Sequence, residues 1–404
     1  MSAKSHRIVI SKNDCVTDFN PGDDLPNFHF IGKENYAGLD AFIKGNKLPL
    51  MVPVDIGTSE KGLCPDEYVG IIVLHDNTQI EIIPPIDREN DKDWNINDAK
   101  YKIIQMLDSM NDIPMKKINK KYYARENLNL FEICVRMFIE EVQNIIFNGL
   151  KQTYVRYQGN ETFVKGKTIY SLHARKNFAH KERFYVEYDV YSTNRAENRL
   201  ILSTMKLLEK LSSDTKNLKK LRTLINEFDG VPESVRYDID FREVNLDRGM
   251  GKYLNAMTWC KLFLLNEGGT FFAGGKVKYA FLFPMNKIFS GYIASKLRRK
   301  INRYKYYFET NEKISNTLNN VHRRGDVSST IYIVSLDYGD ETAMRFMFDD
   351  IDNYFQPQKD NTLVIFPITE TINVNPNNVA KNYYLMDLNR IDESVNMLCD
   401  TYFV

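Results

Sequence analysis

Short apolar runs separated by Gly, Pro, Asp and Asn fill the first 95 residues of the chain. This punctuation is typical of short strands joined by turns. The runs before and after the turn His75-Asp76-Asn77 predict a β-hairpin over residues 69–85. The other runs predict a small β-barrel or sandwich, and the segment over residues 50–67 is expected to be an exposed loop between strands.

A helical repeat of apolar positions begins near Asn97 and is clearest over residues 128–147. One face of that helix carries Phe131, Cys134, Phe138, Val142 and Ile145, at the spacing of a core-facing helix.

After Gly149 the pattern changes to the alternation of strands. We expect a β-hairpin at about 152–191, with turns at Gln158-Gly159-Asn160 and around Ala179-His180-Lys181. Asn194 and Glu197 are spaced as a capping pair for the next helix, over residues 196–211. Helices are also predicted over residues 216–228 and 247–266.

From Tyr279 the pattern predicts a long helix over residues 282–308 with a basic end. A strand over 331–338, a short helix over 342–355, a strand over 362–368 and a last strand-helix pair follow, which is an α/β order. The fold class is therefore predicted as α+β multidomain. The expected domains are an N-terminal β domain (1–95), a helical middle with the hairpin insertion (96–278) and a C-terminal α/β domain (279–404).

Composition excludes few partners. The 404 residues include 54 Lys and Arg and 53 Asp and Glu, so the chain lacks the overall positive charge of a dedicated nucleic-acid binder. There is no GxxxxGK[ST] loop for a nucleoside triphosphate. Neither an N-terminal apolar signal segment nor a membrane-length apolar run occurs, so we expect a cytoplasmic protein with no membrane partner.

The cysteines and histidines suggest no metal or disulfide framework. Five cysteines (Cys15, Cys64, Cys134, Cys260 and Cys399) are scattered without CxxC pairs, and they are expected to be reduced core residues. The six histidines show no HxxxH or HExxH spacing.

Two acids, Asp326 and Asp337, have the spacing of the metal-binding acids in PD-(D/E)xK nucleases. Such a centre also needs a lysine two residues after the second acid, to orient the attacking water beside Mg²⁺. Here that position is Gly339, and no lysine occurs between Lys313 and Lys359. The alternative interpretation is that both acids are turn residues, because each adjoins a Gly-containing turn sequence.

A basic run with interleaved tyrosines, KLRRKINRYKYY over residues 296–307, is a candidate DNA contact. Its cations would hold the phosphate backbone and its tyrosines would stack on bases. The candidate DNA-binding residues are Lys296, Arg299, Lys300 and Arg303. The alternative is a solvated helix face beside buried tyrosines. A solvated face is the favoured interpretation of a second run, KNLKKLR over residues 216–222.

Seven blocks, taken in order, resemble the McrC family, the nuclease-bearing subunit of McrBC-type restriction systems. The most specific block runs from Phe163 to Leu200 and contains Phe-x-x-Gly-Lys, Tyr-Asp and Glu-Asn-Arg-Leu in fixed order. Together the blocks cover most of residues 65–370, and LlaJI-like restriction subunits are a related alternative. The blocks are VGIIVLHDNTQIEIIPPI, LNLFEICVRMFIEEVQNIIFNGLKQTYV, ETFVKGKTIYSLHARKN, RFYVEYDVYSTNRAENRLILSTMKLLEKL, RGMGKYLNAMTWCKLFLL, LFPMNKIFSGYIASKLRRK and TLVIFPI.

The resemblance implies an N-terminal domain that docks on a hexameric McrB-like AAA+ GTPase, reaches into the pore of its ring and stimulates it. It also implies a C-terminal PD-(D/E)xK domain that cuts DNA with Mg²⁺. The segment 50–67 is the candidate for the reaching element. Two departures concern the nuclease: the family's Asp-x-Lys-Tyr is Asp337-Tyr338-Gly339 here, and a Leu-Phe-Glu common in the family is Ile288-Phe289-Ser290.

Three hypotheses follow for the function. The first is a McrC-like subunit that binds and stimulates a McrB-like motor while its own nuclease site is impaired. The second is an active Mg²⁺-dependent restriction endonuclease subunit with a rearranged site. The third is a DNA-binding scaffold protein, which the near-neutral charge disfavours.

Overall fold

The computed structural model describes residues 7–11, 14–22, 25–46, 49–56, 61–84, 96–109, 128–246, 249–265, 270–273, 277–301, 306–310, 318–323, 329–333, 362–368, 383–387 and 390–402. Contacts between residues group the chain into two compact units. Unit 1 comprises residues 1–133 and 266–404, and unit 2 comprises residues 134–265.

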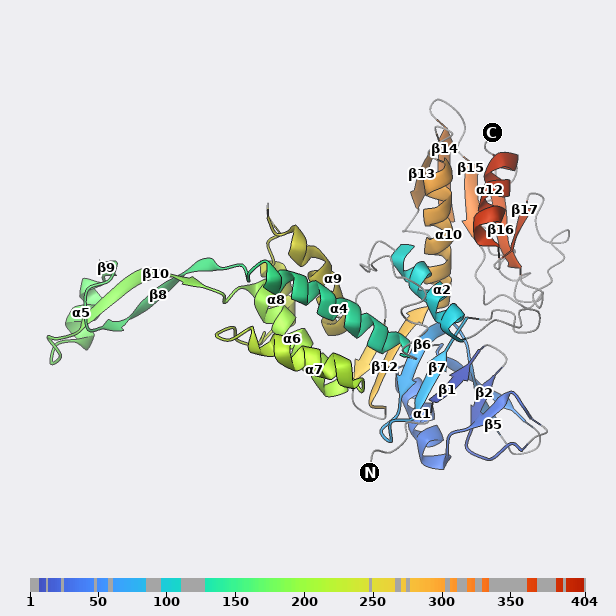
Figure 1. The fold of residues 1–404 in the computed structure, drawn as a ribbon, viewed down its shortest axis with the longest axis horizontal. Coiled ribbons are helices and arrows are strands. Elements are labelled where there is room, and N and C mark those ends of the chain that lie inside the picture. The colour runs from blue at the N-terminus through green and yellow to red at the C-terminus, as the bar shows by residue number, and fades with distance from the viewer. Residues whose placement is uncertain are drawn as a thin grey trace. The chain divides into compact units, whose positions relative to one another are not determined.

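The first sheet of unit 1 has the strand order β1-β7-β6-β12-β11 (Figure 1). β1 (Arg7–Ile10) is parallel to β7 (Gln79–Ile82). The other three pairs are antiparallel: β7 with β6 (Tyr68–Val73), β6 with β12 (Tyr279–Pro284), and β12 with β11 (Thr270–Ala273). The predicted β6–β7 hairpin is confirmed. The predicted helical start at 282 is wrong: Tyr279–Pro284 is a strand, because its buried apolar residues pair with β6. Helix α10 (Met285–Ile301) follows it.

The second sheet has the order β3-β2-β5-β4, formed by Phe28–Phe30, Cys15–Thr17, Lys61–Pro65 and Met51–Asp55, and helix α1 covers Lys33–Asn46. The exposed loop predicted over 50–67 is wrong. β4 and β5 pair along their length in this segment, and Gly62 to Pro65 of β5 are buried. Apolar residues of both sheets belong to one core, for example Val16 and Leu63 with Ile80 and Leu282.

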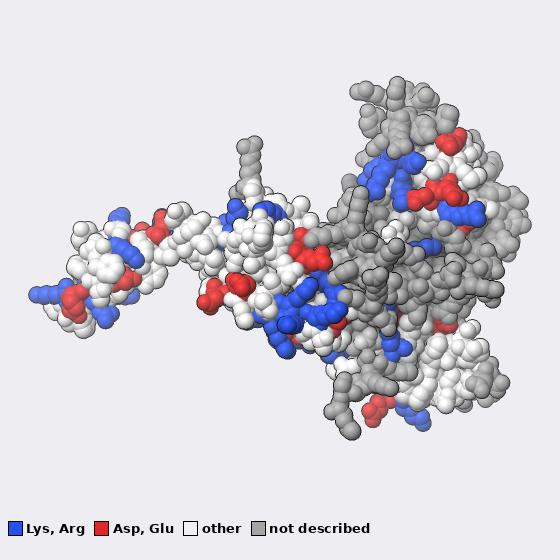
Figure 2. Space-filling model, in the orientation of Figure 1, with Lys and Arg blue, Asp and Glu red and all other residues white. Residues whose placement is uncertain are grey.

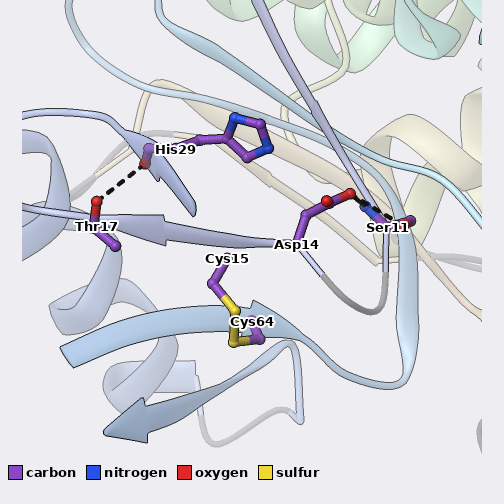
Figure 3. Close-up of a disulfide and its surroundings, with 6 residues drawn as sticks. All are labelled: Ser11, Asp14, Cys15, Thr17, His29 and Cys64. Atoms are coloured by element: carbon purple, nitrogen blue, oxygen red, sulfur yellow. Dashed lines mark hydrogen bonds between the residues drawn. A yellow bond between two sulfur atoms is a disulfide. The ribbon is translucent and has the colours of Figure 1, made fainter. Parts of the chain in front are cut away.

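Cys15 and Cys64 form a disulfide between β2 and β5 (Figure 3). The two residues are opposite each other because Val16 pairs with Leu63 in the antiparallel register. The prediction that these two thiols are reduced is wrong, since linear spacing does not reveal which residues a sheet brings together. The other three cysteines are buried free thiols, as expected. Burial raises the pKa of Cys260 to about 12, which leaves this thiol protonated and unreactive near neutral pH.

A buried carboxylate, Glu81 of β7, ties helix α2 (Ile96–Ser109) to the first sheet. Glu81 forms ion pairs with Arg7 of β1 and with Lys100 of α2, the latter at 3.2 Å. The ammonium of Lys100 also donates a hydrogen bond to the carbonyl of Leu128 at 2.8 Å, just before helix α4 (Leu130–Phe147). Both cations therefore compensate a charge that would be costly to bury alone.

The third sheet of unit 1 has the order β13-β14-β15-β16-β17. Its last three strands are parallel, and helices α10 (Met285–Ile301) and α12 (Ile391–Tyr402) pack together beside it. The predicted strand over 362–368 and the last strand-helix pair are confirmed, whereas the expected helical end at 306–308 is wrong because these residues pair with β14. The helix predicted over 342–355 lies outside the described residues. The strands are Tyr306–Thr310, Leu318–Arg323, Ser329–Ile333, Thr362–Ile368 and Tyr383–Asp387.

Unit 2 is a group of helices with a long ribbon of two strands. The predicted helices of this region are confirmed as α4 (Leu130–Phe147), whose first residues belong to unit 1, α6 (Ala196–Leu211), α7 (Thr215–Asn226) and α9 (Gly251–Leu265), with the short α8 (Tyr237–Glu243). Rings of Phe138 and Phe263 pack at 6.3 Å in the core, and buried Arg136 bonds Asp214 and Asn217 at the start of α7.

The mixed α+β class predicted from the sequence is confirmed. The grouping by contacts divides the chain differently from the three predicted domains. Helix α2 packs on α10 and belongs to unit 1, and β11 and β12 join the sheet built by the N-terminal residues.

The disulfide generates a stability prediction. Cys15 and Cys64 are 49 residues apart, so in the chain-entropy treatment their bond stabilises the folded state by about 4 kcal/mol. We expect thermal denaturation to show a lower Tm for the double variant Cys15→Ser/Cys64→Ser, and a reducing agent to lower the Tm of the wild type alone. An equal response of both proteins to the reducing agent would contradict the prediction.

Candidate partner-binding arm

An antiparallel ribbon extends away from the helices of unit 2 (Figure 1). β8 (Thr153–Glu161) and β10 (Phe184–Ser192) pair over their full length, and β9 (Lys167–Thr168) and helix α5 (Tyr170–Lys176) lie at the far end. We call residues 153–192 the arm, its two long strands the stem, and residues 162–183 the tip. The predicted antiparallel hairpin is confirmed, although its end contains more structure than a turn.

The two turns predicted within the arm have different outcomes. Gln158, Gly159 and Asn160 lie inside β8, paired with β10, so the first predicted turn is wrong. Gly and Asn suggested a turn here, but the cross-strand pairing holds these residues extended. The second turn is confirmed, since the backbone N–H of Arg183 donates to the carbonyl of His180 at 3.1 Å.

The stem exposes large aromatic side chains to solvent. Tyr154 and Tyr191 face each other across the strands with ring centroids 5.0 Å apart, and they are 72% and 61% exposed. A second cross-strand ring pair, Tyr157 with Tyr188, has centroids 5.1 Å apart. Contact between these tilted rings supports the ribbon, yet an isolated two-stranded ribbon is at best marginally stable in water. Exposed rings on such an element are typical of a surface that a partner covers.

The base of the arm is clamped by one buried amide, that of Asn198 in α6. Its Nδ2 donates to the carbonyl of Lys151, before β8, at 3.0 Å and to the carbonyl of Thr193, after β10, at 2.8 Å. Its Oδ1 accepts from the hydroxyl of Tyr253 at 2.9 Å, and that hydroxyl accepts from the backbone N–H of Lys151 at 3.0 Å. Both strands are therefore fixed where they meet the helices.

The residues flanking Asn198 fix the same region through charge. Glu197 accepts two hydrogen bonds from Arg195, at 3.0 and 3.1 Å, and one from the backbone N–H of Asn245. Burial acts to raise the pKa of Glu197, but these hydrogen bonds lower it overall. The guanidinium of Arg199 binds both carboxylate oxygens of Asp240.

The predicted capping pair is wrong. Arg195 occupies the N-cap position of α6, and no side chain there makes a capping hydrogen bond. The side chain of Asn194 instead accepts a hydrogen bond from Arg199 at 2.9 Å, and Glu197 is held by Arg195. Other local side-chain hydrogen bonds have replaced the expected cap.

The tip folds around a pair of amides. Asn160 and Asn177 donate to each other at 2.7 Å in both directions, and Asn177 also donates to the carbonyl of Arg183. Gly166 turns the chain into β9 with φ +64°, and a Cβ there would lie 2.4 Å from the carbonyl oxygen of Glu187. Only glycine fits this position, which explains the Gly of the Phe-x-x-Gly-Lys motif.

The sequence-predicted nuclease residues are not placed by the structure. Asp326 precedes β15 in the sequence, and Asp337 and Gly339 follow it; all three lie outside the described residues. The predicted DNA-binding residue Arg303 also lies outside them. Within the described part of the chain, no group of three or more His, Cys, Asp and Glu could hold a metal ion.

Three of the predicted DNA-binding residues, Lys296, Arg299 and Lys300, lie on α10. They line a groove of about 310 Å³ together with residues of α12. Lys296 forms an ion pair with Asp392 of α12 at 2.6 Å, and its ammonium lies 5.4 Å from the centroid of the Tyr292 ring. Burial acts to lower the pKa of Lys296, but the bond with Asp392 raises it overall. Lys296 is thus charged and already paired, whereas Arg299 is exposed.

Among the described residues, no helix is both long and apolar enough to cross a membrane.

Comparison with known proteins identifies the family. The sequence model described as "McrBC 5-methylcytosine restriction system component" matches residues 63–333. The chain belongs to this McrBC family. No match is found among curated proteins.

Two solved structures of the McrBC family share the fold. A chain of a half-complex from the tetradecameric assembly of Thermococcus gammatolerans McrB AAA+ hexamers with bound McrC is 18% identical, with a TM-score of 0.69. The similarity covers 98% of this chain and 99% of that one. A chain of the Thermococcus gammatolerans McrBC complex, solved by electron cryo-microscopy, is 21% identical, with a TM-score of 0.54, and the match covers 73% of this chain and 88% of that chain.

Sequence reasoning did not select the arm as a site. The signal was present, because the block from Phe163 to Leu200 contains both the glycine turn of the tip and the Glu197-Asn198-Arg199 clamp. What the sequence did not show was that the first part of this block, up to Ser192, joins β8 in one projecting element.

The clamp generates a testable prediction. In the variant Asn198→Ala, the carbonyls of Lys151 and Thr193 lose their shared donor, so we expect the free energy of unfolding to fall by about 3 kcal/mol. Hydrogen exchange should accelerate at the amides of β8 and β10. The control, Asn226→Ala on the exposed end of α7, should change neither quantity. Unchanged exchange in the arm of Asn198→Ala would count against the clamp.

Proposed function

We propose that this chain is a McrC-type subunit of a McrBC restriction complex, which binds a McrB-like AAA+ hexamer and stimulates its nucleotide hydrolysis. The family match supports the restriction-system part of the proposal. The partner is suggested by the fold, which is shared over 98% of the chain with a chain from an assembly of McrB hexamers with bound McrC.

The arm is the element that we assign to partner binding, and its uncovered aromatic surface is the observation that carries the proposal. Tyr154 and Tyr191 are exposed on a ribbon whose base is fixed by Asn198. Because the clamp orders the arm before binding, less conformational entropy is lost when a partner covers it. Aromatic residues are also enriched among the few side chains that dominate the energy of an interface.

The segment 50–67 no longer has the property for which the sequence suggested it. The sequence predicts a long exposed loop here, whereas β4 and β5 pair within a four-stranded sheet, and Cys64 is bonded to Cys15. We therefore assign the reaching role to the arm in place of this segment.

A double substitution on the stem tests the assignment. In Tyr154→Ala/Tyr191→Ala we expect at least tenfold weaker binding to the AAA+ partner and a matching loss of stimulated GTP hydrolysis, measured over a range of subunit concentrations. The control is Tyr237→Ala, which removes an exposed ring from α8 of the same unit. Wild-type stimulation by the stem variant would refute the assignment of the arm.

We further propose that the nuclease site is impaired. Asp326 and Asp337 would hold Mg²⁺, but Gly339 stands where the family's lysine would orient water and compensate developing negative charge. Loss of one such electrostatic element typically reduces the rate by a factor of about 10² to 10³.

The retention of both acids favours the second candidate function, an active Mg²⁺-dependent endonuclease. Arg299 and Lys300 would then contact the DNA backbone.

Cleavage assays separate these two candidates. With Mg²⁺, the AAA+ partner and its nucleotide present, we expect the wild type to cleave DNA no faster than Asp337→Ala. The variant Gly339→Lys should cleave at least tenfold faster than the wild type if the lysine is the missing element. Wild-type cleavage that Asp337→Ala abolishes, with partner binding intact, would establish the active endonuclease instead.

A further inference from the structure

Charge is divided unequally between the two parts of the arm. The tip contains six basic residues and one acidic residue, Glu182, whereas the stem contains one basic residue, Arg156, and three acidic ones. Figure 2 shows Lys and Arg side chains gathered at the far end of the arm. The basic residues of the tip are Lys165, Lys167, Arg175, Lys176, Lys181 and Arg183. Because the two parts differ in charge, the tip presents a different chemistry to a partner from that of the stem.

The cations of the tip outnumber its one carboxylate, Glu182, whose pKa is lowered by a backbone hydrogen bond and in part by the charge of Arg183. All six are exposed, and within the described part of the chain none of them forms a salt bridge. Two of them lie over aromatic rings instead: Lys165 is 4.9 Å from the centroid of Tyr188, and Lys176 is 4.6 Å from that of Tyr185. A ring attracts a cation without removing its charge, so these ammonium groups are positioned and still able to bind an anion.

The tip also exposes planar apolar groups beside these cations. Phe163, Tyr170 and Phe178 are 55%, 79% and 87% exposed. These rings are not needed to build a core, because the tip is held by the Asn160–Asn177 amide pair and by the contacts of α5 with β10.

We infer that the arm tip binds single-stranded nucleic acid, with its cations on the phosphates and its exposed rings stacked on bases. Salt-bridge-free cations and exposed rings in one short element are the combination that binds unpaired strands. An acidic protein surface would match the cations, but stacking on bases also accounts for the three exposed rings. This inference goes beyond the proposed function and does not depend on it, because it requires no AAA+ partner.

Fluorescence anisotropy of the full chain without its partner tests the inference. The probes are fluorescein-labelled dT20, rU20 and a 20-base-pair duplex, titrated at several NaCl concentrations. We expect the single strands to bind more tightly than the duplex, and the preferred strand identifies DNA or RNA. In Arg175→Gln/Lys181→Gln, affinity should fall at least tenfold, and the slope of log K against log salt should decrease by about 1.4, or about 0.7 for each lost contact.

A second variant separates stacking from charge. In Tyr170→Ala/Phe178→Ala we expect about tenfold weaker binding with an unchanged salt slope, because no cation is removed. The matched control is Lys219→Gln/Lys220→Gln on α7, which removes the same charge from another surface of unit 2 and should bind like the wild type.

Three results would overturn the inference. One is wild-type affinity in both tip variants, and another is equal binding of duplex and single strands with no effect of the ring substitutions. The third is a tip variant that loses binding to the AAA+ partner while its nucleic-acid binding is unchanged. That result would show that the tip binds an acidic surface of the partner protein. Because the stem variant Tyr154→Ala/Tyr191→Ala tests the proposed function separately, failure of one idea leaves the other intact.

Discussion

The hydrogen bonds of the Asn198 amide are the interaction on which the arm depends. This one side chain donates to the carbonyl that precedes β8 and to the carbonyl that follows β10, and it accepts from the hydroxyl of Tyr253. All three bonds lie beside the helices of unit 2. A two-stranded ribbon cannot bury enough apolar surface to hold itself in place, so its orientation must come from its base. Arg195, Glu197 and Arg199 surround this amide with charge-assisted bonds, which make the base a rigid support.

A rigid base explains how an arm with exposed rings remains ordered before it meets a partner. The stem bears paired tyrosines and a small acidic excess, and the tip bears cations and separate rings. In unit 1, buried charges have a comparable structural role, since Glu81 joins β1, β7 and α2 through Arg7 and Lys100. Polar residues in both units thus hold elements together at positions where apolar packing alone does not specify one arrangement.

Much of the secondary structure could be predicted from local patterns, and the errors share a cause. The hairpin β6–β7, helices α4, α6, α7 and α9 and the strand at 362–368 were recognised from periodicity. The strands Tyr279–Pro284 and β5 were missed because each pairs with a strand distant in sequence, β6 and β2 respectively. The extended Gln158–Asn160 was missed because pairing with β10 holds it. The arm was missed as a site for the same reason, although its motif residues had been noted.

The sequence by itself determined the family, the α+β class and the replacement of an expected lysine by Gly339, because these depend on residue identity and order. Only the tertiary structure decided that Cys15 meets Cys64, that Asn198 joins both ends of the arm and that residues 153–192 form one projecting element. These features depend on strand register and on hydrogen bonds between distant segments. Local propensity carries no record of such pairings, since their energy exists only once the chain has folded.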